Sequence, residues 1–377
     1  MIVQLPYGRA PRSIEVGDGT CRIVRAAQLP QPRPFAALVD EALASLVLPA
    51  PARRVTIIVS DATRDEPRDE LVRAIGRRLP DAARITLAIA TGTHGPAPAA
   101  FVAALAAVDP RIASVVNHDG HRDDELVALG ATLRGTPILL HRCVVEADLV
   151  IATGCIRPHY FAGFGAGAKA IFPGLGQAAA IRTNHRWKTA PGARAGQLDG
   201  NPCREDLEEA VAAVPVPIVL VNGVCGPDRA IHRVVAGELD AAFRDGCALA
   251  RPWFTVRAAP AALVIASDVP PVTASLYQAA KLAAAVAPLV APGGVLVIAA
   301  ECEDGIEPVD VVNEAIFRIG VLPRLAPGVS LQLLSSLPDT TVARTLLDPC
   351  MIDTISWGAA STLVVPHASM LICEAAS

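Results

Sequence analysis

The sequence is poor in aromatic residues and has no block of like charge. Phe, Trp and Tyr together make up 4% of the 377 residues, whereas hydrophobic residues make up 52%. This composition favours the packing of Ala-, Val- and Leu-rich helices and strands over a β-sandwich. The formal net charge is −4. Because no basic stripe is present either, we do not expect nucleic acid or an anionic membrane as a partner.

Paired cysteines and long apolar runs are also missing. The nine cysteines are isolated, and no CxxC pair occurs, which argues against a zinc knuckle or a secreted disulfide framework. Residues 1–10 lack the apolar core of a signal peptide, and no apolar run free of proline and charge is long enough to span a bilayer. We therefore expect a soluble, cytoplasmic protein.

Short apolar runs alternate with Ala-rich segments along the chain. We predict strands at 54–60, 85–90, 148–152, 218–221, 262–266, 295–300 and 362–365, and helices at 68–78, 98–107 and 202–213. Asn201 followed by Pro202 is typical of a helix start. Strands that are apolar on both faces and alternate with helices favour parallel sheets covered on both sides. The sequence therefore predicts an α/β fold.

The Pro-rich segment 251–260 is the best candidate for a linker, and the length of the chain suggests two domains. We expect residues 1–256 to form an N-terminal cofactor-binding catalytic domain. Residues 262–365 are expected to form a smaller C-terminal α/β domain. Residues 366–377 would then be a tail that can return to the first domain.

Polar side chains follow three of the predicted strands. Arg64 follows 54–60, His94 follows 85–90, and His159 follows 148–152. In open α/β sheets, ligands bind at the carboxyl ends of the strands. A lone loop histidine is usually a surface or capping residue, but the convergence of three such loops favours a functional site.

Lys169 lies in a glycine-rich run without other charges between His159 and Gln177. A lysine in apolar surroundings tends toward a lowered pKa and nucleophilicity. Gly163, Gly165 and nearby residues resemble a dinucleotide fingerprint, but they do not directly follow a strand, and the order of a P-loop is absent. A solvated lysine after a tight turn, or a 2-hydroxy acid dehydrogenase with a diffusible dinucleotide, stays open at this point.

Taken together, these segments resemble the nickel-dependent lactate racemase family. The resemblance is carried by residues 60–64 (SDATR), 90–94 (ATGTH), 117–119 (NHD), 158–176 (PHYFAGFGAGAKAIFPGLG), 184–185 (NH) and 277–281 (YQAAK). These segments occur in the family's order, starting from 5–8 (LPYG). Ten positions separate His159 from Lys169, and sixteen separate Lys169 from His185, which also fits the family.

The resemblance implies a racemase or epimerase of a 2-hydroxy acid with two Rossmann-like α/β domains and the active site in the cleft between them. It further implies a nickel-pincer nucleotide, of the pyridinium-3,5-bisthiocarboxylic acid mononucleotide type, attached covalently to Lys169. His185 would be the protein ligand of Ni(II), a metal that imidazole suits. Transient cofactor-maturation proteins are implied as partners, and a homo-oligomer stays open.

Under this resemblance, His94 and His159 would be the acid/base pair, one on each face of the substrate carbon. Imidazoles suit the task because their unperturbed pKa lies near the working pH. One histidine would take the hydroxyl proton while hydride passes from Cα to the cofactor, and the hydride would return to the other face of a flat 2-oxo acid.

The resemblance also implies the residues that bind substrate and cofactor. The expected substrate-binding residues are Arg64, Tyr277, Gln278 and Lys281, of which Arg64 can bind a carboxylate in bidentate fashion. The expected cofactor-binding residues besides Lys169 are Asp61, Thr63, Gly165 and Gly167, the glycines through backbone amides. Lactate, malate, an aryl-lactate and an aldonate all stay open as substrates, because residues 165–168 (GAGA) replace the Gly-Gly-Pro-like run of the family.

Two further features have alternative interpretations. His118, His121, Asp123 and Asp124 form either a metal site or, as we favour, a loop that buttresses the main site. Trp357 is a candidate wall of the substrate pocket and equally a candidate core residue.

Overall fold

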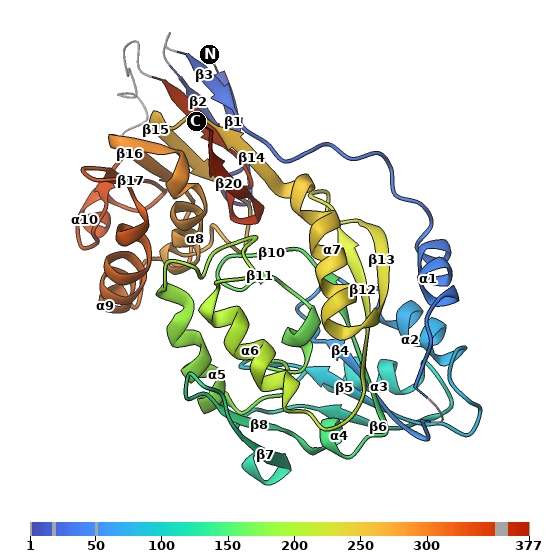
Figure 1. Cartoon of the computed structure of the whole chain (residues 1–377). Helices are drawn as coiled ribbons and strands as arrows, with labels where there is room; N and C mark the ends of the chain where they lie inside the picture. Colours follow the sequence, from blue (N-terminus) through green and yellow to red (C-terminus); the bar gives the residue numbers. More distant parts are fainter. Residues whose placement is uncertain (1, 17–19, 50–51, 351–360, 377) are drawn as a thin grey trace. The chain divides into compact units, whose positions relative to one another are not determined.

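The computed structural model describes residues 2–16, 20–49, 52–350 and 361–376; Trp357 lies outside them. The chain forms two compact units (Figure 1). Unit 1 comprises residues 1–27, 189–195 and 254–377, and unit 2 comprises residues 28–188 and 196–253. This division differs from the expected boundaries of 1–256 and 262–365, because the N-terminal residues join the C-terminal part of the chain.

Unit 2 is built on a six-stranded sheet in the order β13-β12-β9-β4-β5-β6. Its strands are β4 (Arg54–Ser60), β5 (Arg84–Ala90), β6 (Ile112–Asn117), β9 (Leu149–Ile156), β12 (Ile218–Cys225) and β13 (Ile231–Glu238). All neighbours pair in parallel except β12 and β13. The order reverses at β4, with β5 on one side and β9 on the other. A ligand is therefore expected where the carboxyl ends of β4 and β9 meet.

Helices cover both faces of this sheet. On one face, α1 (Phe35–Ala44), α2 (Arg68–Gly76) and α3 (Ala99–Ala106) bury the odd-numbered side chains of β4, such as Ile57. On the other face, α7 (Leu239–Phe254) packs so closely that Gly246 faces Ile156 and Val224. The helices α5 (Ala178–His185) and α6 (Pro202–Ala212) pack against each other.

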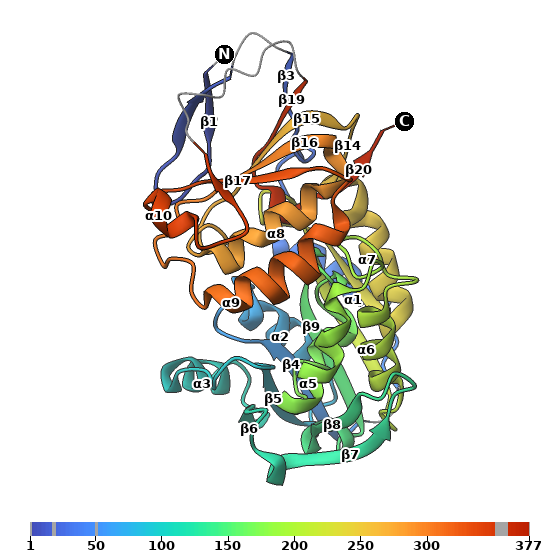
Figure 2. The same cartoon turned by 90° about the vertical axis from the view of Figure 1, so that its left-hand side faces the viewer.

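Unit 1 has its own six-stranded sheet in the order β18-β17-β16-β15-β19-β3, in which every pairing is parallel. Its strands are β3 (Cys21–Ile23), β15 (Ala261–Ser267), β16 (Val290–Ala299), β17 (Ser330–Leu334), β18 (Asp348–Pro349) and β19 (Thr362–Val365). The hairpin of β1 (Ile2–Leu5) and β2 (Arg12–Glu15) packs on one face, and α8 (Leu276–Val286) packs on the other (Figure 2). Because β3 pairs with β19, the N-terminal segment belongs to this unit.

The predicted α/β fold and the predicted strands are confirmed, with ends that shift by up to five residues. Asn201 caps α6 as predicted, since its side chain accepts hydrogen bonds from the amides of Cys203 and Arg204. The predicted linker at 251–260 is wrong, because it ends α7 and forms β14 (Thr255–Ala258). β14 pairs with β20 (Ile372–Ala375), which keeps the C-terminal tail in unit 1.

All nine cysteines are free thiols in the structure. In the part of the chain that the structure describes, no helix combines the length and the apolar character needed to cross a membrane.

Candidate active site

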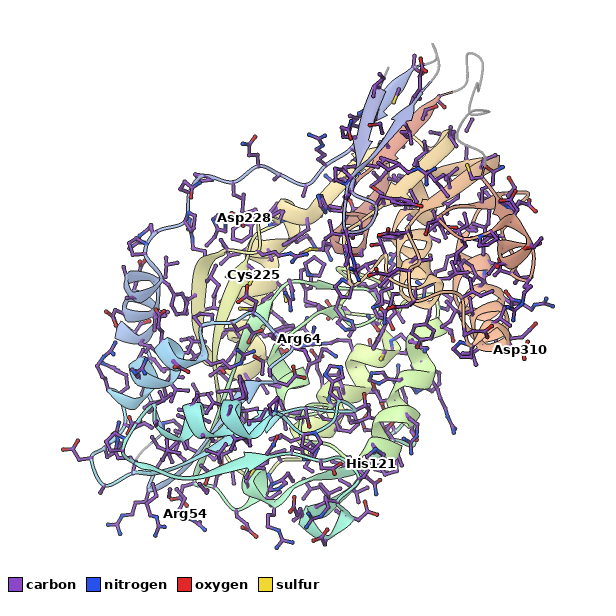
Figure 3. The ribbon with its side chains drawn as sticks, turned by 180° about the vertical axis from the view of Figure 1, so that it is seen from behind. Arg54, Arg64, His121, Cys225, Asp228 and Asp310 are labelled. Carbon is purple, nitrogen blue, oxygen red and sulfur yellow. The ribbon has the colours of Figure 1, made fainter. Side chains whose placement is uncertain are left out.

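The loop after β4 is held in shape by Arg68, a residue that the sequence did not single out. Its Nε donates to the carbonyl of Ser60 at 2.8 Å, and its Nη2 donates to the carbonyl of Asp61 at 2.5 Å and to that of Arg64. Its Nη1 also donates to the carbonyl of Glu66 at 3.2 Å, so one guanidinium satisfies four carbonyls in the turn that carries Arg64. The Arg64 side chain is exposed, and Figure 3 shows it and Arg54 near opposite ends of β4.

His94 is paired with Asp61. Its Nδ1 lies 2.6 Å from Asp61 Oδ2, while Asp61 Oδ1 accepts from the amide of Thr63 at 2.9 Å and from its hydroxyl at 2.5 Å. Burial raises the pKa of Asp61, but the hydrogen bonds from Thr63 and His94 outweigh burial and hold it below its ordinary value. Asp61 therefore stays a carboxylate that orients the imidazole. The side chain of Asp61 is 7% exposed and that of His94 49% exposed, so the free face of His94 is open to a ligand.

His159 lies just after β9, in the short strand β10 (Pro158–His159), which pairs with β11 (Gly163–Phe164). Its Nδ1 accepts a hydrogen bond from the amide of Ala162 at 3.3 Å. Its ring stacks on Tyr160 at 5.3 Å and meets Phe161 edge-on at 4.5 Å. These contacts fix the plane of the imidazole.

Phe161 is the common neighbour of three predicted site residues, although no sequence signal marked it. Its ring centroid lies 4.5 Å from that of His159, 4.9 Å from that of His185, and 5.7 Å from Lys169 Nζ. Phe161 is itself buried. The structure therefore brings His159, Lys169 and His185 together around one aromatic ring.

Lys169 lies in a short 3-10 helix, η2 (Gly167–Ala170), in surroundings that disfavour its charge. Burial and the positive charges of Arg204 and Arg64 lower its pKa to about 8, against a smaller opposite effect of Cys203. About a tenth of the amine is therefore uncharged at pH 7, far more than for a lysine with an ordinary pKa. An uncharged amine is the nucleophilic form.

His185, the last residue of α5, also has a strongly perturbed environment. Burial and the nearby Lys169 and Lys188 lower its pKa to about 4, and the carbonyl of Ile181 offsets this shift only in part. Its Nδ1 is buried and has no hydrogen-bond partner among the described residues. A neutral imidazole with an orphaned nitrogen is the form that binds a metal ion.

In the Lys169 segment, residues 163–176, the amides of two glycines bind other parts of the protein. The amide of Gly167 donates to Asn222 Oδ1 at 3.1 Å, and the amide of Gly165 donates to the carbonyl of Arg157 at 2.8 Å. Both amides thus already have acceptors within the protein, and binding of the cofactor by Gly165 and Gly167 stays a prediction. An added Cβ on Gly167 would lie 2.5 Å from the ring of Phe243, so glycine is needed there for close packing.

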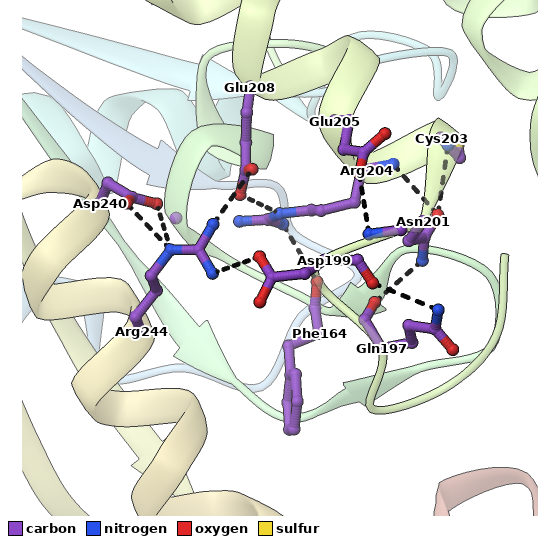
Figure 4. Close-up of polar contacts among 12 residues, drawn as sticks. Phe164, Gln197, Asp199, Asn201, Cys203, Arg204, Glu205, Glu208, Asp240 and Arg244 are labelled. Carbon is purple, nitrogen blue, oxygen red and sulfur yellow. Dashed lines mark hydrogen bonds and ion pairs between the residues drawn. The ribbon is translucent and has the colours of Figure 1, made fainter. Parts of the chain in front are cut away.

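Next to this segment, an ionic network runs from the buried Arg204 to exposed carboxylates at the surface (Figure 4). The guanidinium of Arg204 is fully buried, lies 4.0 Å over the ring of Phe243, and donates to Glu208 at 2.5 Å and to the carbonyl of Phe164 at 3.4 Å. Arg244 pairs in turn with Glu208 and neighbouring carboxylates. A cavity of about 470 Å³ between α6 and α7 opens beside this network, but it is lined by none of the predicted site residues.

In unit 1, Tyr277, Gln278 and Lys281 lie in the first two turns of α8, as predicted. Ser275 caps the helix, and Lys281 Nζ donates to Gln278 Oε1. Tyr277 is 37% exposed. Their role in substrate binding stays a prediction.

Within the described ranges, no group of three or more His, Cys, Asp or Glu side chains is placed to hold a metal ion. One alternative from the sequence, the diffusible dinucleotide, loses support. The glycines after β9 form the β10–β11 hairpin and a 3-10 helix. They do not form the strand–turn–helix unit that a diffusible dinucleotide requires.

Comparison with known proteins shows that the chain belongs to the lactate racemase family. The family described as "Lactate racemase N-terminal domain" matches residues 7–196. A lactate racemase of Thermoanaerobacterium thermosaccharolyticum is 32% identical over 265 residues, which cover 67% of this chain and 61% of that protein. A lactate racemase of Lactiplantibacillus plantarum is 30% identical over 259 residues, with the same coverage. The match thus spans about three-fifths of the curated relatives' length.

The fold is similar to that of solved structures over nearly the whole chain. The lactate racemase apoprotein from Thermoanaerobacterium thermosaccharolyticum superposes with a TM-score of 0.82 at 24% identity, covering 99% of this chain and all of that one. A protein from Thermotoga maritima superposes with a TM-score of 0.64 at 15% identity, covering 90% and 97%. These likenesses concern the fold alone.

Proposed function

This chain belongs to the lactate racemase family, and we propose that it interconverts the two enantiomers of a 2-hydroxy acid. Racemisation requires hydrogen to leave Cα from one face and to return to the other. The hydroxyl proton must also be taken up and given back, which is work for a general acid and a general base. The grouping of His159, Lys169 and His185 around Phe161 is the observation that carries this proposal.

The residues at this site fit the nickel-pincer nucleotide that the family uses. Lys169 has the low pKa of an amine that forms covalent bonds, and the orphaned, uncharged imidazole of His185 suits a metal. Lys169 would hold the group covalently, and His185 would ligate its nickel. When bound, the group supplies an acceptor and a donor for the hydrogen of Cα.

His94 would take the proton of the substrate hydroxyl at its Nε2. Because Asp61 is a carboxylate 2.6 Å from Nδ1, the neutral imidazole carries its proton on Nδ1 and leaves the lone pair of Nε2 free. When Nε2 is protonated, the same carboxylate stabilises the imidazolium. Asp61 is thus proposed as a positioning residue for His94, beside or in place of its expected contact with the cofactor.

His159 would serve the opposite face of the substrate carbon. The amide of Ala162 donates to its Nδ1, so the neutral ring carries its proton on Nε2. The two histidines are therefore held in different tautomers, one with a free lone pair on Nε2 and the other with a proton there. With its proton on Nε2, the neutral His159 can donate a hydrogen bond to the oxygen of a 2-oxo acid.

Arg64 is proposed to bind the substrate carboxylate. Its side chain is exposed, and its positive charge contributes to the lowered pKa of Lys169. A guanidinium binds a carboxylate in bidentate fashion, which fixes the orientation of the carbon next to it. Tyr277, Gln278 and Lys281 of unit 1 are proposed as further substrate-binding residues. Which 2-hydroxy acid is bound, lactate, malate or a larger one, is left to experiment.

The experiment is a screen of single enantiomers of 2-hydroxy acids with protein co-expressed with cofactor-making enzymes. We expect optical activity to decay to zero with one of them, and Lys169→Arg to abolish the decay. Substrate deuterated at Cα should keep its label in both enantiomers. Wash-out of the label to solvent would indicate enolisation, and absence of racemisation with every acid would contradict the proposal.

A further inference from the structure

We propose that His118 is a positioning residue that keeps the three segments carrying His94, Lys169 and His185 in one arrangement. It lies in the His118 segment, residues 117–120, which connects β6 to the next turn of chain. The expected effect of His118 on kcat rests on the proposed function, whereas its expected effect on the arrangement of the three segments does not.

Each of the three segments is hydrogen-bonded to the His118 segment. Thr91, three residues before His94, donates its hydroxyl to the carbonyl of His118 at 2.7 Å. His118 Nε2 lies 3.0 Å from the carbonyl of Gly176, at the end of the Lys169 segment. The amide of Ala178, which begins the helix that ends at His185, donates to the carbonyl of Gly120 at 2.8 Å.

Gly120 shows how closely these segments approach one another. A Cβ added there would lie 3.0 Å from the carbonyl oxygen of Gly176, 3.1 Å from the amide nitrogen of Ala178 and 3.1 Å from the carbonyl oxygen of Gly92. One backbone atom comes from each of the three segments, and none of them is a flexible side-chain end. Any side chain larger than hydrogen must therefore push at least one segment away.

The imidazole of His118 does more than fill space. A carbonyl oxygen only accepts hydrogen bonds, so the contact with Gly176 places the proton on Nε2. Nδ1 is then left buried and without a partner among the described residues, and the ring meets His141 edge-on at 5.9 Å. An unpaired buried nitrogen is destabilising, so an apolar side chain of similar size would avoid this cost. Unlike an apolar side chain, however, the imidazole donates a hydrogen bond to Gly176.

The catalytic consequence follows from the distances at which proton and hydrogen transfer work. A displacement of about 1 Å at a reacting group costs on the order of 10²-fold in rate. The amide of Gly92 also donates to the carbonyl of Gly174 at 2.9 Å, so loss of the bond to Gly176 is expected to loosen the Lys169 segment relative to the loop that carries His94 without releasing it. The rate constant kcat should therefore fall, whereas KM should change little, because Arg64 is held separately by Arg68.

The test compares His118→Leu with His118→Gln, whose Nε2 can donate in the position of the imidazole Nε2. Gly120→Ala is a second, independent variant that leaves the imidazole in place. Leu105→Ala, a buried core residue of α3, is the control for loss of stability alone. Two quantities are measured for all of them: amide hydrogen exchange of segments 91–94 and 174–178 in the protein without cofactor, and kcat and KM of the matured enzyme.

We expect faster exchange in both segments and a 10- to 100-fold lower kcat for His118→Leu and Gly120→Ala. In His118→Gln, the change in exchange and the change in kcat should each be at most half of that in His118→Leu. Leu105→Ala should leave kcat and the exchange of both segments unchanged. Unchanged exchange in His118→Leu, or a His118→Gln variant as impaired as His118→Leu, would overturn the role of the N–H bond. If the wild-type chain racemises no hydroxy acid, the proposed function fails, while the exchange data still decide the role of His118.

Discussion

His94 and His185 are the same side chain in two opposite environments. His94 is half exposed at the end of β5, and a carboxylate lies 2.6 Å from its Nδ1. His185 ends α5, has a pKa lowered to about 4 by burial and Lys169, and keeps a buried Nδ1 without a partner in the described part of the chain. The first imidazole is exposed and oriented by a carboxylate, whereas burial and Lys169 oppose the gain of a proton by the second. We therefore infer that His94 handles protons and that His185 stays neutral as a ligand.

The largest expected effect separates the two roles by metal content. His185→Ala should lose nickel and all measurable activity, because the only protein ligand that we propose is removed. His94→Ala should keep its nickel and lose about 10²–10⁴-fold of its activity, which is the usual cost of removing a general base. The measurement is nickel by elemental analysis beside racemisation rate. Stoichiometric nickel in His185→Ala, or its loss in His94→Ala, would reverse the assignment.

A smaller effect is expected when only the carboxylate beside His94 is changed. Asp61→Asn keeps the size of the side chain but removes the charge that stabilises the imidazolium and fixes its tautomer. We expect kcat to fall by about 10²-fold, with nickel content unchanged. Thr63→Val, which loses only one of the hydrogen bonds to Asp61, should have a weaker effect. An Asp61→Asn variant with wild-type kcat would show that His94 acts without the carboxylate.

The comparison also shows what the sequence could and could not predict. Strands buried on both faces were found almost to the residue, as at 54–60, because a continuous apolar run between turn residues has few other interpretations. The extension of β9 to Ile156 was missed, because Thr153, Gly154 and Cys155 break that run. Pairing with β12 supplies the hydrogen bonds that continue the strand there.

The residues of the candidate site were predictable where the end of a strand determines their location. Arg64, His94 and His159 follow strands, so the edge rule located them. No such signal marked Phe161, Arg68 or the pairing of Asp61 with His94. Their contacts join segments that are far apart in sequence or depend on the direction of a side chain. The N-terminal strands were missed for a similar reason, since β3 acquires its partner β19 only from the far end of the chain.

The third prediction concerns the stability of the protein without cofactor. The pKa of His185 is about 4 in the folded state and about 6.5 when unfolded, so the unfolded state binds more protons between these values. Stability should therefore fall by on the order of 2 kcal/mol as pH drops from about 6.5 to about 4. Urea unfolding at pH 7 and pH 4.5 measures it.

The matched variants are His185→Gln and Leu105→Ala. His185→Gln should lose less stability at low pH than wild type does. Leu105→Ala should have a free energy of unfolding that is lower than that of wild type by the same amount at both pH values. A pH dependence that is unchanged in His185→Gln would mean that other groups cause it.

The smallest effect is expected from backbone strain next to Lys169. Ala166 has φ 62° and ψ −158°, a region that is essentially restricted to glycine. Ala166→Gly should therefore stabilise the protein by about 1 kcal/mol. Ala168→Gly, in the same segment but without a positive φ, should destabilise it by about 1 kcal/mol. Urea unfolding of both variants is the measurement, and an Ala166→Gly variant less stable than wild type would rule out releasable strain.

The central claim is that Lys169 carries the group that performs the chemistry. Its most direct test is the intact mass of active protein co-expressed with the cofactor-making enzymes, followed by peptide mapping. We predict a mass above that of the sequence by one modified nucleotide, with the addition on the peptide that contains Lys169 and none in Lys169→Arg. Racemase activity in protein of unmodified mass would contradict the account.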